Sequence, residues 1–315
     1  MSRIFGAFEG PDLHAIVGVV DYKMTFGDQI AECGGISGVA TMPGQRSQKL
    51  INVLLEEACK EMNERGVAFS ALYPFSYPFY ERSGYAATHW DWRVQTTCAW
   101  LKKISKGGNA KNYRYVRKER GELILPVYER WYRQFNLNLN RWEEKLKSML
   151  TWPGRDWDWR MFLHDDGYIL MNIHRGNDPK TLRVVEFGYL TEQAYLDGLA
   201  LLGQMDTQFE EVKMILPEVD RFLKPGVPYP KPIMHRAPDM MTRVVNLQAF
   251  EKLLPNGLGG LQLADPLGIT CSSDGVVGVG EIVQIVTGFF EKPDPRCPQL
   301  HAVVADKPAF CVERY

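Results

Sequence analysis

A short run of polar and basic residues just before a helix is the part of this sequence best suited to chemistry. Residues 36–41 read as an apolar strand, and from residue 47 the pattern becomes helical. Between them the chain places Thr41, Gly44, Gln45, Arg46 and Ser47. The first amides of a helix have no acceptor within it, and the helix dipole is positive there, so such a start can bind an anion. The layout suits a small molecule that carries phosphates and a thioester.

The elements around this turn follow from hydrophobic periodicity. Residues 4–8 and 15–22 read as two strands joined by a turn of Glu, Gly, Pro and Asp. In the helix that follows the turn, apolar residues recur at three- and four-residue spacing up to Met62, and Gly66 stands where a left-handed helix cap favours glycine. Residues 69–73 read as the next strand. The order is strand, turn, helix, strand and aromatic turn.

The middle of the chain has the same mixed character. Residues 102–115 are rich in Lys, Gly and Asn and predict a linker or loop. A charged helix is predicted over 139–150, and two paired strands over 168–173 and 182–190. Thr191 is the predicted N-cap of the helix that follows, and Asp165, Asp166 and Gly167 predict a hairpin turn rather than a metal site.

The last third begins after a connector with five prolines, residues 224–238. Residues 241–245 predict a strand, and Asn246 is the predicted N-cap of a short helix. Two further strands are predicted over 261–264 and 268–271, and a helix over 282–290.

Bulk properties exclude several classes of protein. The 315 residues suffice for two or three domains, and a charged fraction of 24% with a net charge of −1 indicates a globular protein without the basic field of a nucleic-acid or acidic-membrane binder. No apolar run reaches the ~18 residues of a membrane span. The six cysteines are scattered without a C-x-x-C pair, which argues against a zinc site and a disulfide scaffold and favours a reduced, cytoplasmic setting. The histidines form no ligand spacing, so no metal is expected.

Several phrases in this order resemble one family. GVAT-x-P and LYPFSYPFYERSGY are similar to the acyl-CoA half of GNAT N-acetyltransferases of the Eis branch (enhanced intracellular survival), which acetylate amines. DDGYILMNIHRG and LRVVEFGYLTEQAYLDGLALL resemble that family's second, degenerate GNAT domain. MMTRVVNLQAFEKLLP resembles the entry into its C-terminal domain, and ADKPAFCVERY is like its C-terminus.

The resemblance implies an α+β fold of two tandem GNAT-like domains, the second degenerate, followed by a domain with the sterol-carrier-protein-2 fold. The implied boundaries are 1–101, 102–228 and 229–315. It also implies acetyl-CoA as co-substrate, a polyamine- or aminoglycoside-like amine as acceptor, and a homohexamer. A complete member of the family has a strand and two helices before the strand near residue 4, so the chain is expected to lack a piece.

The same resemblance implies the residues that bind the acyl donor. Val39 and Thr41 would bind the pantetheine through main-chain atoms, although an ordinary buried strand would look the same. The implied phosphate contacts, which a solvated helix start would equally explain, are Arg46, Ser47, Gln48 and Lys49.

Two tyrosines match the implied acid and base. Tyr80 matches the general acid, whose hydroxyl is protonated at neutral pH because its ordinary pKa is near ~10. Tyr85 is the alternative acid, and simple packing of an aromatic turn is the alternative role. The C-terminal carboxylate, on Tyr315, matches the base, with Glu313 beside it as added negative charge; an inert, frayed terminus is the alternative.

Three tryptophans could line an amine pocket, but strand packing is favoured; they are Trp152, Trp157 and Trp159.

One departure from the family pattern keeps a second function open. The pyrophosphate turn follows Gln/Arg-x-x-Gly-x-Gly/Ala, and this chain has Lys49 and Ile51 at the two small positions. Glycine there lets the backbone approach phosphate without a Cβ in between, whereas Lys49 could offer its ammonium instead. The alternative to an acetyltransferase is therefore a non-catalytic binding or assembly protein with impaired CoA binding.

Overall fold

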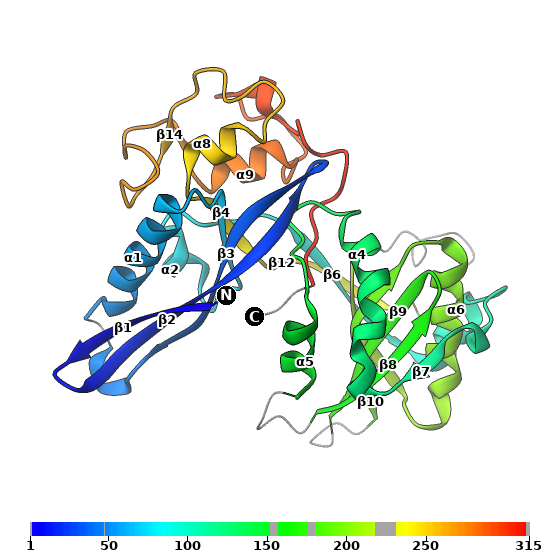
Figure 1. Cartoon of the computed structure of the whole chain (residues 1–315). Helices are drawn as coiled ribbons and strands as arrows, with labels where there is room; N and C mark the ends of the chain where they lie inside the picture. The colour runs from blue at the N-terminus through cyan, green and yellow to red at the C-terminus, as the bar shows by residue number, and fades with distance from the viewer. Residues whose placement is uncertain (1, 47, 152–156, 175–179, 218–230, 313–315) are drawn as a thin grey trace. The chain divides into compact units, whose positions relative to one another are not determined.

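The computed structural model describes residues 2–46, 48–151, 157–174, 180–217 and 231–312. Backbone contacts divide the chain into two compact units. Unit 1 comprises Met1–His89, Phe135–Asn140 and Pro238–Tyr315, and unit 2 comprises Trp90–Gln134 and Arg141–Ala237. Each unit has its own mixed sheet with helices, so the predicted α+β class is confirmed (Figure 1). No helix in the described part of the chain is long and apolar enough to cross a membrane.

The sheet of unit 1 has the order β1-β2-β3-β4-β13-β5. Neighbours are antiparallel except β3 and β4, which run parallel. The strands are β1 (Ser2–Glu9), β2 (Asp12–Phe26), β3 (Gln29–Thr41), β4 (Phe69–Leu72), β5 (Ala86–Ala87) and β13 (Met241–Val244). The strands predicted for residues 4–8, 15–22 and 36–41 are confirmed, and each is longer than its predicted core.

Helix α1 (Leu50–Glu64) covers one face of this sheet, and the short helix α2 (Tyr77–Glu81) follows β4. The buried face of α1 packs against Ala15, Val17 and Val19 of β2 in one hydrophobic cluster. Each fully buried aliphatic side chain contributes roughly 1.5–3 kcal/mol. The helix approaches so closely that a Cβ on Gly34 would lie 2.0 Å from the sulfur of Met62. Gly66 has the positive φ predicted for it, 72°.

The C-terminal part of unit 1 is tied to this sheet. It contains α8 (Leu247–Glu251), β14 (Leu263–Ala264), β15 (Val277–Gly278), α9 (Glu281–Val286) and the 3-10 helix η5 (Pro298–Leu300). Asn246 caps α8 by accepting from the amide of Ala249 at 2.8 Å, as predicted. Arg243 of β13 donates to Asp265 at 2.7 Å, and both side chains are fully buried. The strand predicted for residues 241–245 is β13, which lies between β4 and β5 in the sheet of unit 1. The division of the chain into three domains stays a prediction.

The strand predicted for residues 268–271 was wrong. This segment is a turn, because the carboxylate of Asp265 accepts from the amides of Leu267, Ile269 and Thr270 at 2.8–3.1 Å. Those amides therefore have no need of a neighbouring strand.

The sheet of unit 2 has the order β12-β6-β11-β10-β9-β8-β7. Its strands are β6 (Trp90–Thr97), β7 (Arg114–Val116), β8 (Trp157–His164), β9 (Gly167–His174), β10 (Thr181–Tyr189), β11 (Glu211–Leu216) and β12 (Ile233–Pro238). Its helices are α3 (Cys98–Ile104), α4 (Leu125–Tyr132), α5 (Glu143–Thr151) and α6 (Glu192–Gly203), with 3-10 turns η2 (Ala110–Asn112), η3 (Lys118–Ile124) and η4 (Gln204–Thr207). The antiparallel pairing of β9 and β10 and the Thr191 cap were predicted correctly.

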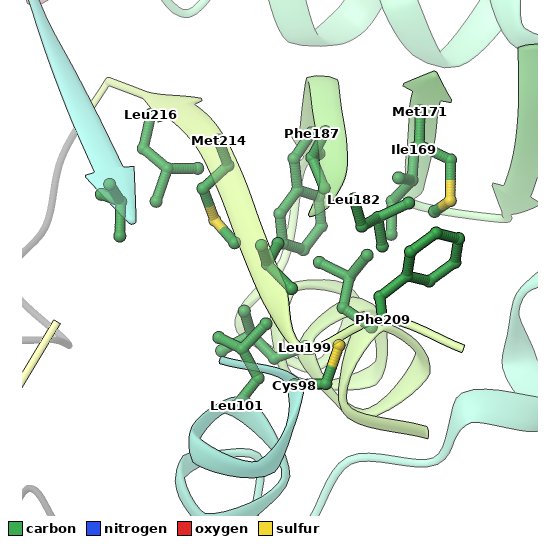
Figure 2. Close-up of a cluster of buried hydrophobic side chains, with 14 of the residues drawn as sticks. Cys98, Leu101, Ile169, Met171, Leu182, Phe187, Leu199, Phe209, Met214 and Leu216 are labelled. Atoms are coloured by element: carbon green, nitrogen blue, oxygen red, sulfur yellow. The ribbon is translucent and has the colours of Figure 1, made fainter. Parts of the chain in front are cut away.

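Both faces of this second sheet are covered. Ile169 and Met171 of β9 lie in a hydrophobic cluster with Leu199 of α6 (Figure 2). Tyr168, which directly precedes Ile169 in β9, points to the opposite face, where its ring contacts Tyr128 and Trp131 of α4. The sheet is therefore sandwiched between α4 and α6.

Two predictions in unit 2 need correction. Residues 102–115 are not a structureless linker, because they hold the end of α3, η2 and the start of β7. The buried carboxylate of Asp197 fixes them by accepting from the amide of Asn109 and the side chain of Asn112, both at 2.7 Å. Helix α5 begins at Glu143 rather than at residue 139, because residues 136–140 instead pair with β2 through backbone hydrogen bonds.

Candidate functional site

Strand β3 bends at a bulge before it reaches the predicted anion site. Ser37 pairs with Gly18 and Ala40 with Ile16, so two residues of β3, Gly38 and Val39, oppose a single residue of β2. Gly38 has a φ of 60°, the left-handed conformation that glycine adopts without steric cost. A bulge of this kind re-aims the strand and increases its twist.

Beyond the bulge, β3 has a free backbone edge. Its parallel pairing with β4 covers only Cys33 to Gly35. The amide of Met42 donates to His14 of β2 at 2.8 Å. Successive peptide groups of a strand point to opposite sides. The backbone groups of Val39 and Thr41 therefore point away from β2, towards the edge of β3 that no longer pairs with β4. They are positioned to hydrogen-bond an extended ligand.

The turn that follows keeps a glycine-like conformation without glycine. Lys49 is the N-cap of α1 and has a φ of 58°, which non-glycine residues rarely adopt. Its carbonyl accepts from the amide of Asn52 at 2.9 Å. Among the described residues, no acceptor binds the amides of Leu50 and Ile51. These amides are the unpaired donors that an anion requires.

A hollow of about 690 Å³ lies between the end of β3, the start of α1 and the α2 segment. Three exposed cations line it, Arg46, Lys49 and Arg82, and none of them has an ion pair with another described residue. No acidic residue is among the described residues that line it, which are Val39, Ala40, Thr41, Gln45, Arg46, Lys49, Leu50, Ile51, Asn52, Phe75, Phe79 and Arg82. Its walls thus combine positively charged and apolar side chains.

The structure brings together four of the residues predicted to bind the acyl donor, Val39, Thr41, Arg46 and Lys49. Gln48 is not among the lining residues, and its side-chain amide instead donates to Gln45. Ser47 lies outside the described residues. Sequence reasoning missed Arg82, although it stands two residues after Tyr80 in the aromatic phrase; a basic residue in an otherwise aromatic turn was the available signal.

Ile51 occupies the second position at which a small residue was expected. Its side chain is 8% exposed and belongs to the core cluster under α1. The Ile51 side chain therefore packs mainly in the protein interior, although it also contributes to the wall of the hollow.

Tyr80 lies in an aromatic cluster beside the hollow. Its ring is 5.2 Å from that of Phe75 and 5.1 Å from that of Phe79, between centroids, and both phenylalanines line the hollow. Burial raises the pKa of Tyr80 to about 12, so its hydroxyl is protonated at neutral pH. Tyr85, the alternative acid, shares a 2.7 Å hydrogen bond with Ser70 inside the core. Neither tyrosine is among the residues that line the hollow, but only Tyr80 contacts the rings of Phe75 and Phe79, which do.

The residues before the chain's end contact the residue that follows β4. Tyr315 and Glu313 lie outside the described residues. The Tyr73 hydroxyl donates to the carbonyl of Cys311 at 3.3 Å, and Cys311 and Val312 are both buried. Tyr73 directly follows β4 and precedes Phe75 of the hollow by two residues.

Of the three tryptophans considered for an amine pocket, Trp159 is buried within β8, as strand packing predicts. Trp152 and the side chain of Trp157 are not described.

A bulged strand runs into a helix start that carries cations and amides with no acceptor among the described residues, which is the arrangement that the sequence predicted for an acyl-CoA site. The family model of the acetyltransferase (GNAT) domain matches residues 1–88. The chain is 30% identical over 201 residues to the "N-acetyltransferase Eis" of Mycobacterium tuberculosis (strain ATCC 25177 / H37Ra) and of Mycobacterium bovis (strain BCG / Pasteur 1173P2). Residues 1–88 therefore match a GNAT acetyltransferase domain, and 201 residues of the chain are similar in sequence to Eis.

The match to these curated relatives is partial. It covers 60% of this chain and 50% of each relative, so the chain spans about half the length of the curated relatives it matches.

Solved structures share the fold over most of the chain. Eis1 from Mycobacterium abscessus has a TM-score of 0.74 at 13% identity and covers 99% of this chain and 91% of its own. A GCN5-related N-acetyltransferase from Anabaena variabilis ATCC 29413 has a TM-score of 0.78 at 15% identity, covering 99% and 89%. A probable N-acyltransferase of unknown function from Enterococcus faecalis V583 has a TM-score of 0.74 at 21% identity, covering 92% and 80%.

Proposed function

We propose that this protein binds acetyl-CoA in the hollow beside α1 and transfers the acetyl group to an amine. One observation carries the proposal: the hollow joins the end of β3 to a helix start whose first amides and three cations have no partner among the described residues. The amides and the cations suit the phosphates of CoA, and the edge at Val39 and Thr41 suits the amide-bearing pantetheine arm. Ser47 and Gln48 belong to the same proposed phosphate turn.

In the proposed reaction the amine nitrogen attacks the thioester carbonyl directly. The carboxylate of Tyr315 takes the proton that the amine loses, and the carbon–sulfur bond breaks as the tetrahedral intermediate collapses. The departing thiolate takes the proton of the Tyr80 hydroxyl, which later regains one from solvent. Products are an acetylated amine and CoA. The proposed acceptor is a polyamine- or aminoglycoside-like amine, as the sequence resemblance to the Eis branch implies.

Further features of the family enter only as proposals. These are a second, degenerate GNAT-like domain, a C-terminal domain of the sterol-carrier-protein-2 fold, a homohexamer and a cytoplasmic location. The sequence resemblance to the Eis branch is the ground for each of these proposals.

A non-catalytic binding protein is the second candidate, because Lys49 and Ile51 stand where small residues are expected. Titration calorimetry with acetyl-CoA, followed by assay of CoA release in the presence of spermidine, separates the two candidates. Binding with release supports the transferase. Weak or absent binding, or binding without release under any amine, supports the second candidate, and absence of binding also overturns the proposed site.

The same titration tests the cations individually. Arg82→Gln removes a charge-assisted contact worth about 1.5–3 kcal/mol, and we expect affinity for acetyl-CoA to fall at least about tenfold. Lys103→Gln changes an exposed cation of α3 that does not line the hollow; it is the matched control and should leave affinity unchanged. Equal effects of the two substitutions would show that overall charge, not the hollow, governs binding.

A further inference from the structure

A fully buried arginine from the last third of the chain holds the turn that follows α2. Arg243 of β13 is 0% exposed, and its guanidinium donates to the carbonyl of Ser83. The same group donates to Asp265 at 2.7 Å and to Thr270 at 3.2 Å. The rigid, planar arrangement of its donors lets one guanidinium bind several acceptors at once. Arg243 therefore joins the end of α2 to the turn that contains Asp265 and Thr270.

The charge of Asp265 fixes the position of this guanidinium. Burial alone would raise the pKa of Asp265, but the Arg243 guanidinium and the amides of Thr270 and Leu267 hold the pKa below its ordinary value. The carboxylate is therefore ionised at neutral pH, and a hydrogen bond between two ionised groups is stronger than one to a neutral carbonyl. Asp265 thus sets where Arg243 lies, and Arg243 sets where Ser83 lies.

The turn that Arg243 holds directly follows a residue of the hollow. Arg82, the C-cap of α2, lines the hollow, and Ser83 is the next residue. The amides of Ser83 and Tyr85 both donate to the carbonyl of Tyr80, at 2.9 and 3.2 Å. Residues 80–85 therefore form one closed turn, and a shift of Ser83 would carry Arg82 with it.

A second contact from the same part of the chain packs against this turn. A Cβ on Gly280 would lie 2.5 Å from the carbonyl oxygen of Gly84 and 2.6 Å from the amide nitrogen of Ala86. Gly84 has a φ of 79°, and a Cβ there would lie 2.9 Å from the side chain of Val279. The two backbones thus approach each other without room for a side chain between them. This packing leaves the turn little freedom to move.

We propose that Arg243 is a positioning residue for the acyl-donor site, which holds the turn after α2 so that Arg82 meets a phosphate of bound acetyl-CoA. This inference rests on the proposed function. Arg243 is not among the described residues that line the hollow, and it acts through Ser83 rather than on the donor itself. A site built from the beginning of the chain thus depends on a residue 160 positions beyond Ser83.

A double-mutant cycle, measured by titration calorimetry with acetyl-CoA, tests this role. Arg243→Lys keeps a positive charge beside Asp265 but replaces the planar fork that spans Ser83 and Asp265 with a point charge. It should weaken binding about fivefold and reduce the loss caused by Arg82→Gln from about tenfold to about twofold. A variant that only destabilised the fold would leave the factor for Arg82→Gln unchanged.

Lys49→Gln is the matched comparison within this cycle. Lys49 lines the hollow from the start of α1 rather than from α2. Its substitution should weaken binding by the same factor in the parent and in Arg243→Lys. If the factors for Lys49→Gln and Arg82→Gln shrink together, the hollow as a whole is altered, and a role specific to the turn after α2 is overturned.

Gly280→Ala decides the question if Arg243→Lys does not fold. Its Cβ pushes on the backbone of Gly84 and Ala86 and leaves the ion pair of Arg243 in place. It should therefore also reduce the factor for Arg82→Gln. Gly278→Ala is its control, because the Cβ there would meet the side chain of Glu281 and not the turn, and the factor should stay at about tenfold.

The outcomes separate this inference from the proposed function. If acetyl-CoA binds and Arg82→Gln costs the same factor in a folded Arg243→Lys as in the parent, the positioning role is overturned and the acyl-CoA site stands. Where Arg243→Lys does not fold, an unchanged factor in Gly280→Ala overturns it in the same way. If acetyl-CoA does not bind the parent protein, the proposed function fails and the positioning role fails with it.

Discussion

At the scale of single residues, Lys49 has a backbone conformation typical of glycine, the residue that the family pattern places at this position. Its φ of 58° is one that glycine adopts freely and that costs other residues about 1 kcal/mol or more. The backbone path of the turn is therefore maintained at an energetic cost. The Lys49 side chain lines the hollow, where its ammonium can compensate for the lost close approach.

Lys49→Gly should therefore raise the free energy of unfolding by about 0.5–1 kcal/mol. Lys49→Ala keeps the strain and should leave it unchanged within about 0.5 kcal/mol. Urea unfolding followed by circular dichroism measures both. Equal stabilities of the glycine and alanine variants would contradict a strained Lys49. Glycine at this position is also a cleaner probe of phosphate binding than Ile51→Gly, which would empty part of the core.

Tyr80 gives a prediction with a pH dependence. Burial raises its pKa to about 12, so its hydroxyl remains a proton donor well above neutral pH. With Tyr80 as acid, the rate of acetyl transfer should show no decline from Tyr80 ionisation between pH 7 and about 10. Tyr80→Phe should lower kcat by roughly 100-fold and leave the affinity for acetyl-CoA unaltered.

Steady-state rates against pH, for the parent and for Tyr80→Phe, provide the measurement. Tyr85→Phe is the companion variant, because its hydroxyl is bonded to Ser70 in the core and outside the hollow. A larger loss of kcat in Tyr85→Phe than in Tyr80→Phe, at equal stability, would assign the acid to the other tyrosine.

At the scale of elements, the bulge in β3 decides where the free edge begins. Gly38 allows the bulge because it adopts a φ of 60°. A Cβ at this position would have no heavy atom within 4 Å, so a substitution there acts on the backbone conformation rather than through a clash. Gly38→Val should cost about 1–2 kcal/mol of stability through backbone strain alone. It should also weaken acetyl-CoA binding, because a straightened β3 no longer presents Val39 and Thr41 to the hollow.

Gly10 supplies the control for this prediction. It lies in the turn between β1 and β2, has a φ of 58° and also has open space around it. Gly10→Val should cost similar stability and leave the calorimetric affinity for acetyl-CoA intact. If both valine variants bind acetyl-CoA as the parent does, the bulge has no role in binding.

These elements also show how far sequence reasoning reaches. The strand, the helix start and the caps at Thr191 and Asn246 were predictable because each depends on neighbours within a few residues. The bulge was not, since it depends on the register against β2. Nor was the insertion of β13 between β4 and β5, which joins residues about 170 positions apart. Arg82 enters the hollow only because α2 folds back beside α1, so its role required the structure.

At the scale of the whole molecule, the hollow and the last described residues, 304–312, belong to one unit although they come from opposite ends of the chain. Unit 1 gathers residues from the beginning, the middle and the end of the sequence. Asn136, from the middle, bonds both to Gly27, in the turn after β2, and to Lys307. An alteration at the end of the chain should therefore act on a site built mainly from its first 88 residues.

The last prediction follows from that arrangement. A short peptide added after Tyr315 converts its carboxylate into a neutral amide, which cannot accept the proton of the attacking amine. Turnover of acetyl-CoA with spermidine should then fall by roughly 100-fold or more, the loss typical of a missing general base. Acetyl-CoA affinity should be retained, because the cations and amides of the hollow are unchanged. The same peptide placed before Met1 controls for the added mass, and CoA release and calorimetry measure the two effects separately. Full turnover in the C-terminally extended protein would remove Tyr315 from the mechanism while leaving the donor site in place.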